Sequence, residues 1–250
     1  AFDDFFELHG DRTYGDDQAM VTGFARIEDQ RFLLVGHRKG RTMKERLACN
    51  FGCAHPEGYR KAQRKMKLAA QMGLPIVSLI NTPGAYPGIG AEERGQAGAI
   101  AESILSMFHL DVPILSIVIG EGGSGGALGV GVGDRVLMME YSYYSVISPE
   151  GCAAILWKDG ARTPDAATAL RLTSDDLTEL GVVDGVIDEP RGGAHRDRQG
   201  AIKKMREVLL AELKALKEIP RDELTTRRRA KYRHLGAIQG RFPSSGAAKA

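Results

Sequence analysis

Glycines crowd the part of the sequence that follows a short apolar run. The run Ile114–Ile119 is β-branched and introduced by a proline, which predicts a buried strand. Glycines then occupy positions 120, 122, 123, 125 and 126, around Ser124. Because glycine is costly to order, its repeated use here indicates that backbone N–H groups come close to a bound group. N–H groups at the start of a helix favour negatively charged oxygen, so this stretch predicts an anion site.

One interpretation of this stretch is a dinucleotide-binding turn. Gly120, Gly122 and Gly125 form a G-x-G-x-x-G, and Glu140 lies twenty residues beyond Gly120, where a ribose-binding acid is expected. Only ten residues separate Ser124 from the next predicted strand at Arg135. A crossover helix that supports a pyrophosphate is normally longer, so we do not favour this interpretation.

A second interpretation is the nucleophile turn of a serine hydrolase. Gly122, Ser124 and Gly126 form a G-x-S-x-G, and His195 and His234 are candidate bases downstream. The third member of the triad is not defined, because six aspartates are available: Asp159, Asp165, Asp175, Asp176, Asp184 and Asp188. This hypothesis therefore remains open at the level of the sequence.

A third interpretation requires no reactive side chain. Paired glycine N–H groups at a helix start would form an oxyanion hole for an enolate or a ureido oxygen. The simplest alternative is structural, because a tight strand-to-helix turn can need glycine only for close packing.

Composition excludes several classes of protein. Hydrophobic residues make up 43% and charged residues 26% of the 250 positions, which is typical of globular proteins. With 34 basic and 32 acidic residues, the net charge of +2 gives no general argument for nucleic-acid binding. Cys49, Cys53 and Cys152 match neither a disulfide framework nor a zinc site, so a reducing, cytoplasmic setting is expected. No run of residues predicts a membrane span or a signal peptide.

The periodicity of apolar residues alternates between strands and helices, which predicts an α/β fold. Residues 1–8 predict a short helix, and two strands forming a hairpin are expected at 20–27 and 32–35. Further strands are expected at 76–80, 135–139, 143–147 and 182–187. Longer helices are expected at 57–72, 91–110, 199–219 and after Pro220.

Three basic segments and one rigid loop could also bind ligands. Residues 36–41 form a basic loop between glycines, suited to an anion or an acyl carrier, although such loops are more often solvated turns. The basic residues of 60–67 and 227–233 are expected first of all on exposed faces. The loop 81–90 contains two prolines and three glycines at the carboxyl end of a strand, where ligands bind in parallel α/β sheets.

Four motifs together closely resemble the alpha subunit of bacterial acetyl-CoA carboxylase carboxyltransferase. They are Asn81–Gly88 (NTPGAYPG), Ala91–Gln96 (AEERGQ), Gly120–Ala127 and Tyr144–Ala153 (YSVISPEGCA), and the segments 36–41 and 192–196 support them. The likeness extends from Ala1 to about Leu235, so we expect a carboxyltransferase domain over 1–235 and a disordered tail over 236–250. Members of that family usually begin with a further helical segment, which this sequence does not include.

The resemblance implies a crotonase-like fold, a spiral of ββα units with helices at its C-terminal end. It implies an alpha2-beta2 assembly in which a zinc-ribbon beta subunit presents acetyl-CoA and this chain takes carboxybiotin from the biotin carrier protein, forming malonyl-CoA. The N–H groups of Gly125 and Gly126 would then form the oxyanion hole, shaped by Gly122 and Gly123. The resemblance further implies that the biotin channel is lined by loop residues Gly84, Ala85, Tyr86, Pro87 and Gly88.

These implications leave two rival functions, a serine hydrolase that uses Ser124 and a non-catalytic assembly subunit. The resemblance implies no metal in this chain and no requirement for nucleic acid or a membrane. Related acyl-CoA substrates and any activity of the isolated chain remain open.

Overall fold

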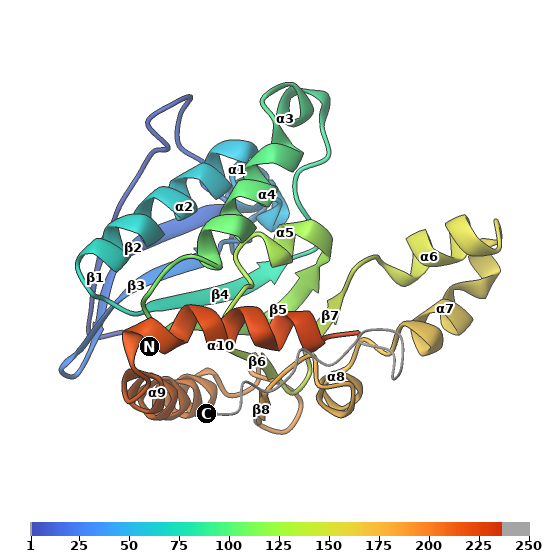
Figure 1. The fold of residues 1–250 in the computed structure, drawn as a ribbon. Coiled ribbons are helices and arrows are strands. Elements are labelled where there is room, and N and C mark those ends of the chain that lie inside the picture. Colours follow the sequence, from blue (N-terminus) through green and yellow to red (C-terminus); the bar gives the residue numbers. More distant parts are fainter. Residues whose placement is uncertain (1, 237–250) are drawn as a thin grey trace.

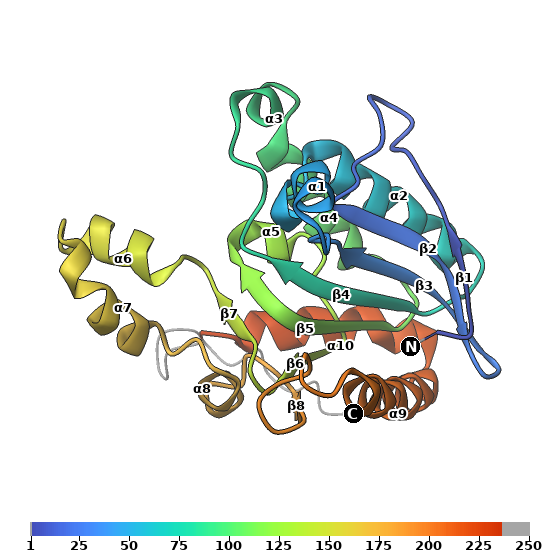
Figure 2. The ribbon, with the colours of Figure 1, turned by 180° about the vertical axis from the view of Figure 1, so that it is seen from behind.

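The computed structural model describes residues 2–236 and builds them around one mixed sheet (Figures 1 and 2). Its order is β1-β2-β3-β4-β5-β6-β8, with β7 paired to β5. The strands are β1 (Asp4–Glu7), β2 (Met20–Ile27), β3 (Gln30–His37), β4 (Ile76–Thr82), β5 (Ile114–Gly123), β6 (Arg135–Met139), β7 (Tyr143–Ser145) and β8 (Gly185–Ile187). The pairs β1–β2 and β2–β3 are antiparallel, and the pairs from β3 onward are parallel.

Helices cover both faces of this sheet and extend beyond it. The α-helices are α1 (Met43–Ala48), α2 (Pro56–Gln71), α3 (Ile89–Glu93), α4 (Gln96–Met107), α5 (Ser124–Leu128), α6 (Pro149–Leu156), α7 (Thr163–Leu170), α8 (Ser174–Glu179), α9 (Arg198–Lys217) and α10 (Arg221–His234). Two short 3-10 helices, η1 (Asn50–Gly52) and η2 (Gly160–Arg162), complete the described elements.

The core has two layers, one on each face of the sheet. Helices α2, α4 and α5 lie on one face, where Tyr59 and Met66 of α2 pack with Ile80 and Val118 of the sheet (Figure 1). Helix α9 lies on the other face, where its buried apolar residues repeat at helical spacing. They are Met205, Leu209, Leu213 and Leu216. The sheet is therefore covered on both faces, as expected for parallel strands.

Helices α6 and α7 project from this body as an arm (Figures 1 and 2). They pack mainly on each other, through a small cluster of Cys152, Ala153 and Ala166. Ile155 and Leu156 on the arm are 68% and 66% exposed. Ser148 caps α6 by accepting a hydrogen bond from Gly151 N–H at 3.1 Å, as the Ser-Pro pair of the sequence predicts.

Two predictions about secondary structure are wrong. Residues 4–7 form an edge strand rather than a helix, because their backbone pairs with β2 while Phe2 packs edge-on against Phe32 at 5.7 Å. The helix predicted over 91–110 is two helices, since Gly95 adopts a left-handed conformation with φ +79° between α3 and α4. The hairpin and the other predicted strands are present, within a few residues of the expected bounds.

The basic segments at 60–67 and 227–233 are not simply exposed faces. Lys61 is 1% exposed, and its ammonium group binds Asp16 and the carbonyl of Asp17. Arg228 is 1% exposed, and its guanidinium pairs with both carboxylate oxygens of Asp134 at 2.8 and 2.9 Å. These two cations connect distant segments, so part of each basic run is structural.

Arg228 joins α10 to the rest of the body. Besides Asp134, it donates hydrogen bonds to the carbonyls of Leu110 and Val112 at 2.8 and 3.0 Å. We expect Arg228→Ala to lower the free energy of unfolding by about 3–5 kcal/mol, because Asp134 would be left as an unpaired buried charge. Urea denaturation of Arg229→Ala, whose side chain is exposed, provides the control and should change stability by less than about 0.5 kcal/mol. Equal effects of the two substitutions would contradict this assignment.

Candidate functional site

The glycine turn lies at the carboxyl end of β5, where the chain passes directly into α5. The first N–H groups of any helix have no carbonyl partner within the helix, and here they belong to Ser124, Gly125 and Gly126. Ser124 is exposed, Gly125 is half-buried and Gly126 is buried. The turn therefore lies at an end of the sheet where Ser124 and Gly125 are accessible and Gly126 is not.

The turn is packed directly against the backbone of the loop that follows β4. A Cβ atom at Gly123 would lie 2.0 Å from the carbonyl oxygen of Pro83, and one at Gly126 would lie 2.4 Å from the backbone nitrogen of Ala85. Such distances leave no room for any side chain. Gly125 is different, because its nearest neighbour would be Ile100 at 3.8 Å. Gly123 and Gly126 are therefore required for close packing, whereas Gly125 is not.

The loop around Tyr86 is held in place by α2 and α4. Tyr86 N–H donates to the carbonyl of Ala54 at 3.0 Å, and the Tyr86 ring stacks on His55 with 4.2 Å between ring centroids. The Gln96 amide donates to the carbonyls of both Ala54 and Tyr86, at 2.9 and 3.0 Å. The Thr82 hydroxyl also donates a hydrogen bond to the carbonyl of Gly84 and accepts one from the N–H of Gly84. The loop is thus fixed before any ligand arrives.

The structure divides the predicted site residues between two cavities. Ser124 and Gly125 line an apolar cavity of about 390 Å³. Tyr86, Pro87 and Gly88 line a separate cavity of about 370 Å³ with the start of α4, including Gln96 and Ile100. Gly84, Ala85, Gly123 and Gly126 form the packed backbone contact instead, and Gly122 pairs with Tyr144 of β7.

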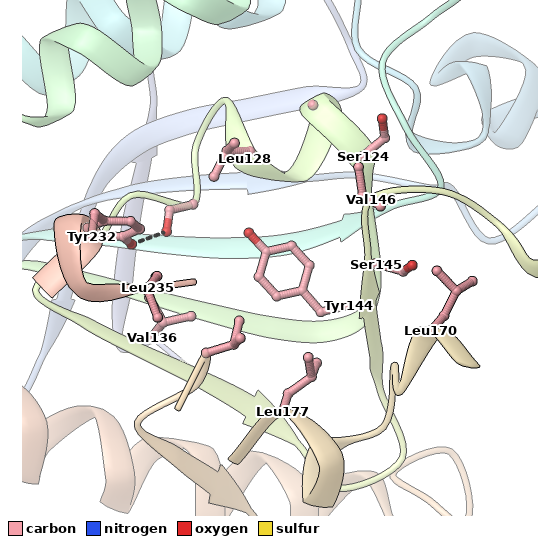
Figure 3. Close-up of a pocket in the computed structure, with 13 residues that line it drawn as sticks. Ser124, Leu128, Val136, Tyr144, Ser145, Val146, Leu170, Leu177, Tyr232 and Leu235 are labelled. Atoms are coloured by element: carbon pink, nitrogen blue, oxygen red, sulfur yellow. Dashed lines mark hydrogen bonds between the residues drawn. The ribbon is translucent and has the colours of Figure 1, made fainter. Parts of the chain in front are cut away.

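The cavity beside Ser124 has walls that the sequence analysis did not identify (Figure 3). They come from β6, β7, α5, α7, α8, α10 and the segments beside them, and comprise Leu128, Gly131, Val136, Tyr144, Ser145, Val146, Leu170, Leu177, Val182, Tyr232 and Leu235. In Figure 3 the Tyr144 ring extends into the space between α5 and Leu177. Burial raises the pKa of Tyr144 to about 12, so its hydroxyl stays protonated. Tyr144, Ser145 and Val146 belong to the motif Tyr144–Ala153, but no local motif predicts the cavity, because its other walls come from distant segments.

Ser124 has the backbone geometry of a nucleophile turn but no base. Its φ of +53° is rare for a residue with a side chain and places its side chain at the surface. Among the described residues, no histidine lines the adjacent cavity or forms a hydrogen bond with Ser124. His195 lies beside Gly193, and His234 is exposed at the end of α10. The structure therefore does not support the serine hydrolase interpretation.

The acidic residue that the dinucleotide interpretation requires, Glu140, has a structural role instead. The Glu140 carboxylate accepts a hydrogen bond from the N–H of Glu189 at 3.0 Å and so fixes the segment after β8. A Cβ atom at Gly120 would meet the Asn81 side chain at 2.8 Å, which gives this glycine a packing role.

The basic loop after β3 lies next to the glycine turn. Lys39 forms an ion pair with Glu121 of β5, and burial lowers the pKa of Lys39. His37 is buried, and its Nδ1 accepts a hydrogen bond from Asn81 N–H at 3.4 Å. Burial, together with the charge of Lys39, lowers the pKa of His37 to about 3. The imidazole is therefore neutral and structural at neutral pH.

Neither a metal centre nor a membrane span is found among the described residues. Residues 2–236 contain no group of three or more His, Cys, Asp or Glu side chains that could hold a metal ion. Within the same range, no helix has the length and apolar character needed to cross a membrane. The tail predicted for 236–250 falls outside the described residues from position 237 onward.

Solved structures show which fold this chain has. The chain is similar to transcarboxylase 12S, with a TM-score of 0.71 and 20% identity over 87% of this chain and 40% of that one. It is also similar to a chain of a Pseudomonas malonate decarboxylase hetero-tetramer, with a TM-score of 0.69 and 15% identity over 88% of this chain and 90% of that one. The fold is that of the crotonase-like carboxyltransferases, which confirms the predicted fold class.

Sequence relatives define the family. A family model described as acetyl co-enzyme A carboxylase carboxyltransferase-like matches residues 1–236. The acetyl-coenzyme A carboxylase carboxyl transferase subunit alpha of Rhodopirellula baltica is 59% identical over 95% of this chain and 75% of its own length. The subunit of the same name from Xanthomonas axonopodis pv. citri is 57% identical over the same shares. The chain belongs to the family of acetyl-CoA carboxylase carboxyltransferase alpha subunits.

The packing of the turn predicts different results for its two inner glycines. We expect Gly126→Ala to lower the free energy of unfolding by about 1–3 kcal/mol, because the new methyl group would collide with the backbone of Gly84 and Ala85. The free energy of unfolding of Gly125→Ala should lie within about 1 kcal/mol of the wild-type value, because its Cβ atom has room. Thermal and urea unfolding measure both, and equal destabilisation would contradict the assigned packing.

Burial of His37 predicts a loss of stability in mild acid. Its pKa of about 3 in the folded chain lies below the ordinary value of 6.5, so the unfolded chain binds the extra proton between these values. Stability should therefore fall as the pH drops below 6.5, by about 2 kcal/mol between pH 7 and pH 5 from this group. Urea titrations at pH 7 and pH 5 should give a smaller change in the free energy of unfolding for His37→Gln than for the wild type. An unchanged difference would show that other groups cause the acid sensitivity.

Proposed function

We propose that this chain forms half of a carboxyltransferase site and works with a zinc-bearing beta subunit in an alpha2-beta2 assembly. The pair would move the carboxyl group from carboxybiotin, carried by the biotin carrier protein, to acetyl-CoA, giving malonyl-CoA for fatty acid biosynthesis. Membership of the alpha-subunit family supports the reaction class. The three free cysteines agree with a cytoplasmic setting.

The observation that carries the chemical proposal is the fixed start of α5. Its N–H groups have no partner within the helix, and Ser124 and Gly125 border an apolar cavity. Carboxybiotin would supply the carboxyl group, and negative charge on oxygen develops both when that group leaves and when the thioester forms an enolate. The N–H groups of Gly125 and Gly126 would donate hydrogen bonds to such an oxygen.

Close packing would make these donors effective. Because α5 rests on the backbone of Pro83, Gly84 and Ala85, its N–H groups need no rearrangement when charge develops. Donors that are oriented in advance contribute more in a dry site than in water. The adjacent cavity is lined mostly by apolar side chains, so few other polar groups would compete for the reacting oxygen. Gly125 borders the cavity directly, whereas Gly126 lies one residue deeper.

The loop residues Gly84 to Gly88 would guide the biotin arm, although Tyr86, Pro87 and Gly88 border a different cavity and Gly84 and Ala85 pack against the turn. This cavity is lined by Tyr86, Pro87, Gly88 and Ile100, and Ile100 is also the nearest neighbour of a Cβ atom at Gly125. Ile100 thus links the lining of this cavity to the glycine turn. A channel along this loop would bring a carried group to the donors from the side of α4.

The reverse half-reaction tests this proposal. The chain, assembled with the beta subunit from the same genome, should carboxylate biocytin at the expense of malonyl-CoA. Gly125→Val should reduce kcat by about 10²–10³-fold, because its side chain would cover the N–H groups at the turn. Ser124→Ala, which keeps the backbone donors, should retain activity within a few-fold of the wild type.

Circular dichroism and size-exclusion chromatography of each variant complex provide the folding control. An assembled complex without any activity would contradict the carboxyltransferase proposal and favour a non-catalytic assembly subunit. Loss of activity in an assembled Ser124→Ala complex would show that the Ser124 hydroxyl takes part in carboxyl transfer and would contradict a site made of backbone donors alone.

A further inference from the structure

The basic loop after β3 encloses a cavity that the proposed chemistry does not use. This cavity has a volume of about 900 Å³ and lies between the end of β3, the residues of α1 and Asn81 at the end of β4. Pockets of this size hold small molecules, and the carboxyl ends of parallel strands are where α/β proteins bind them. The cavity is therefore placed and sized for a ligand.

The charge of its lining is strongly one-sided. Four cations, Arg38, Lys39, Arg41 and Lys44, face one carboxylate, Glu45. That carboxylate accepts hydrogen bonds from the N–H groups of Arg41 and Thr42, which lower its pKa and hold it at the start of α1. Glu45 therefore shapes the loop and also interacts electrostatically with Arg41 and Arg38, and as the only carboxylate of the lining it leaves the four cations in excess.

Two of the four cations have acidic partners and two do not. Arg38 pairs with Glu7 at 3.3 Å, and Lys39 pairs with Glu121. Within the described part of the chain, the side chains of Arg41 and Lys44 form no ion pair. An anion with two or more charges would satisfy both, and the arginine fork matches the oxygens of phosphate.

Helix α1 borders the cavity and has little packing against the rest of the chain. None of its six residues is buried, although a helix of this length has little stability of its own in water. Thr42, Lys44, Glu45 and Ala48 of this segment all border the cavity. A bound anion would attach the helix to the end of β3 and so replace the packing that the helix lacks.

The amide side chains of Gln18 and Asn81 complete the polar lining. A cavity lined by cations and neutral hydrogen-bonding groups suits a small phosphorylated molecule better than a flat protein surface does. The ion pair between Lys39 and Glu121 connects this recess with β5, only four residues before Gly125. A ligand that reaches the glycine turn could therefore extend into this cavity.

We propose that the cavity bordered by Arg41 and Lys44 binds the phosphate groups of the coenzyme A substrate. The choice of coenzyme A as the source of phosphate rests on the proposed function, whereas phosphate binding itself rests on the cavity alone. This chain would then hold the nucleotide end of a thioester that the beta subunit also contacts. The alpha subunit would contribute to substrate affinity as well as to oxyanion stabilisation.

Direct binding to the purified chain is the first test. Calorimetry should detect binding of coenzyme A and of ADP, weakened by added salt, and little binding of pantetheine, which has no phosphate. The double variant Arg41→Gln/Lys44→Gln should weaken binding of coenzyme A by about tenfold or more, because two charge-assisted contacts are lost. The control Lys203→Gln/Arg229→Gln removes the same charge from exposed positions elsewhere and should bind as the wild type does.

Three results would overturn the proposal. They are equal binding of pantetheine and coenzyme A, equal weakening by both double variants, and no binding of either phosphorylated probe. Binding of ADP or inorganic phosphate without binding of coenzyme A would overturn the assignment to the substrate and identify a site for free phosphates.

Kinetics of the assembled complex separate this inference from the proposed function. In the reverse half-reaction, Arg41→Gln/Lys44→Gln should raise KM for malonyl-CoA about tenfold and affect kcat far less. An active complex in which KM is unchanged would overturn the inference and leave the proposed function intact. A complex that binds coenzyme A through Arg41 and Lys44 but has no activity would overturn the proposed function alone.

Discussion

The contact between the glycine turn and the loop after β4 sets the geometry of the whole candidate site. At Gly123 and Gly126 one backbone lies directly against another, with no side chain between them. The loop is in turn fixed by Tyr86 and Gln96 to the segment that begins α2. The orientation of the N–H groups at the start of α5 therefore depends on strands β4 and β5, on α2 and on α4 at once. A site of this kind is rigid because it belongs to the core.

The same contact explains why the glycines of the turn have different roles. Gly123 and Gly126 are explained by packing alone, which was the simplest interpretation of the sequence. Gly125 has space around it, so packing does not explain its lack of a side chain. Gly125 borders the cavity, and a Cβ atom there would have only Ile100 within 4 Å. Packing thus explains the missing side chains at Gly123 and Gly126, whereas the glycine at position 125 has no packing explanation.

Local patterns predicted the parallel strands and long helices, because the apolar periodicity of Ile76–Ile80 or Met205–Leu216 reflects burial directly. The N-terminal strand was missed because its phenylalanines are spaced as on a helix, while pairing with β2 decides its conformation. The walls of the apolar cavity were missed because Leu128, Val146 and Tyr232 meet only in the folded chain. Charge patterns were misleading at Lys61 and Arg228, since composition does not reveal a buried partner.

The arm of α6 and α7 has its own consequence for assembly. Its internal core consists of small residues, Cys152, Ala153 and Ala166, so opening the arm costs much less than unfolding the sheet. Amide hydrogens of the arm should therefore exchange through local opening, well before those of β4 and β5. A subunit that covered Ile155 and Leu156 would suppress this opening and spend part of its binding energy on ordering the arm. Subunit association would then be coupled to the local folding of α6 and α7.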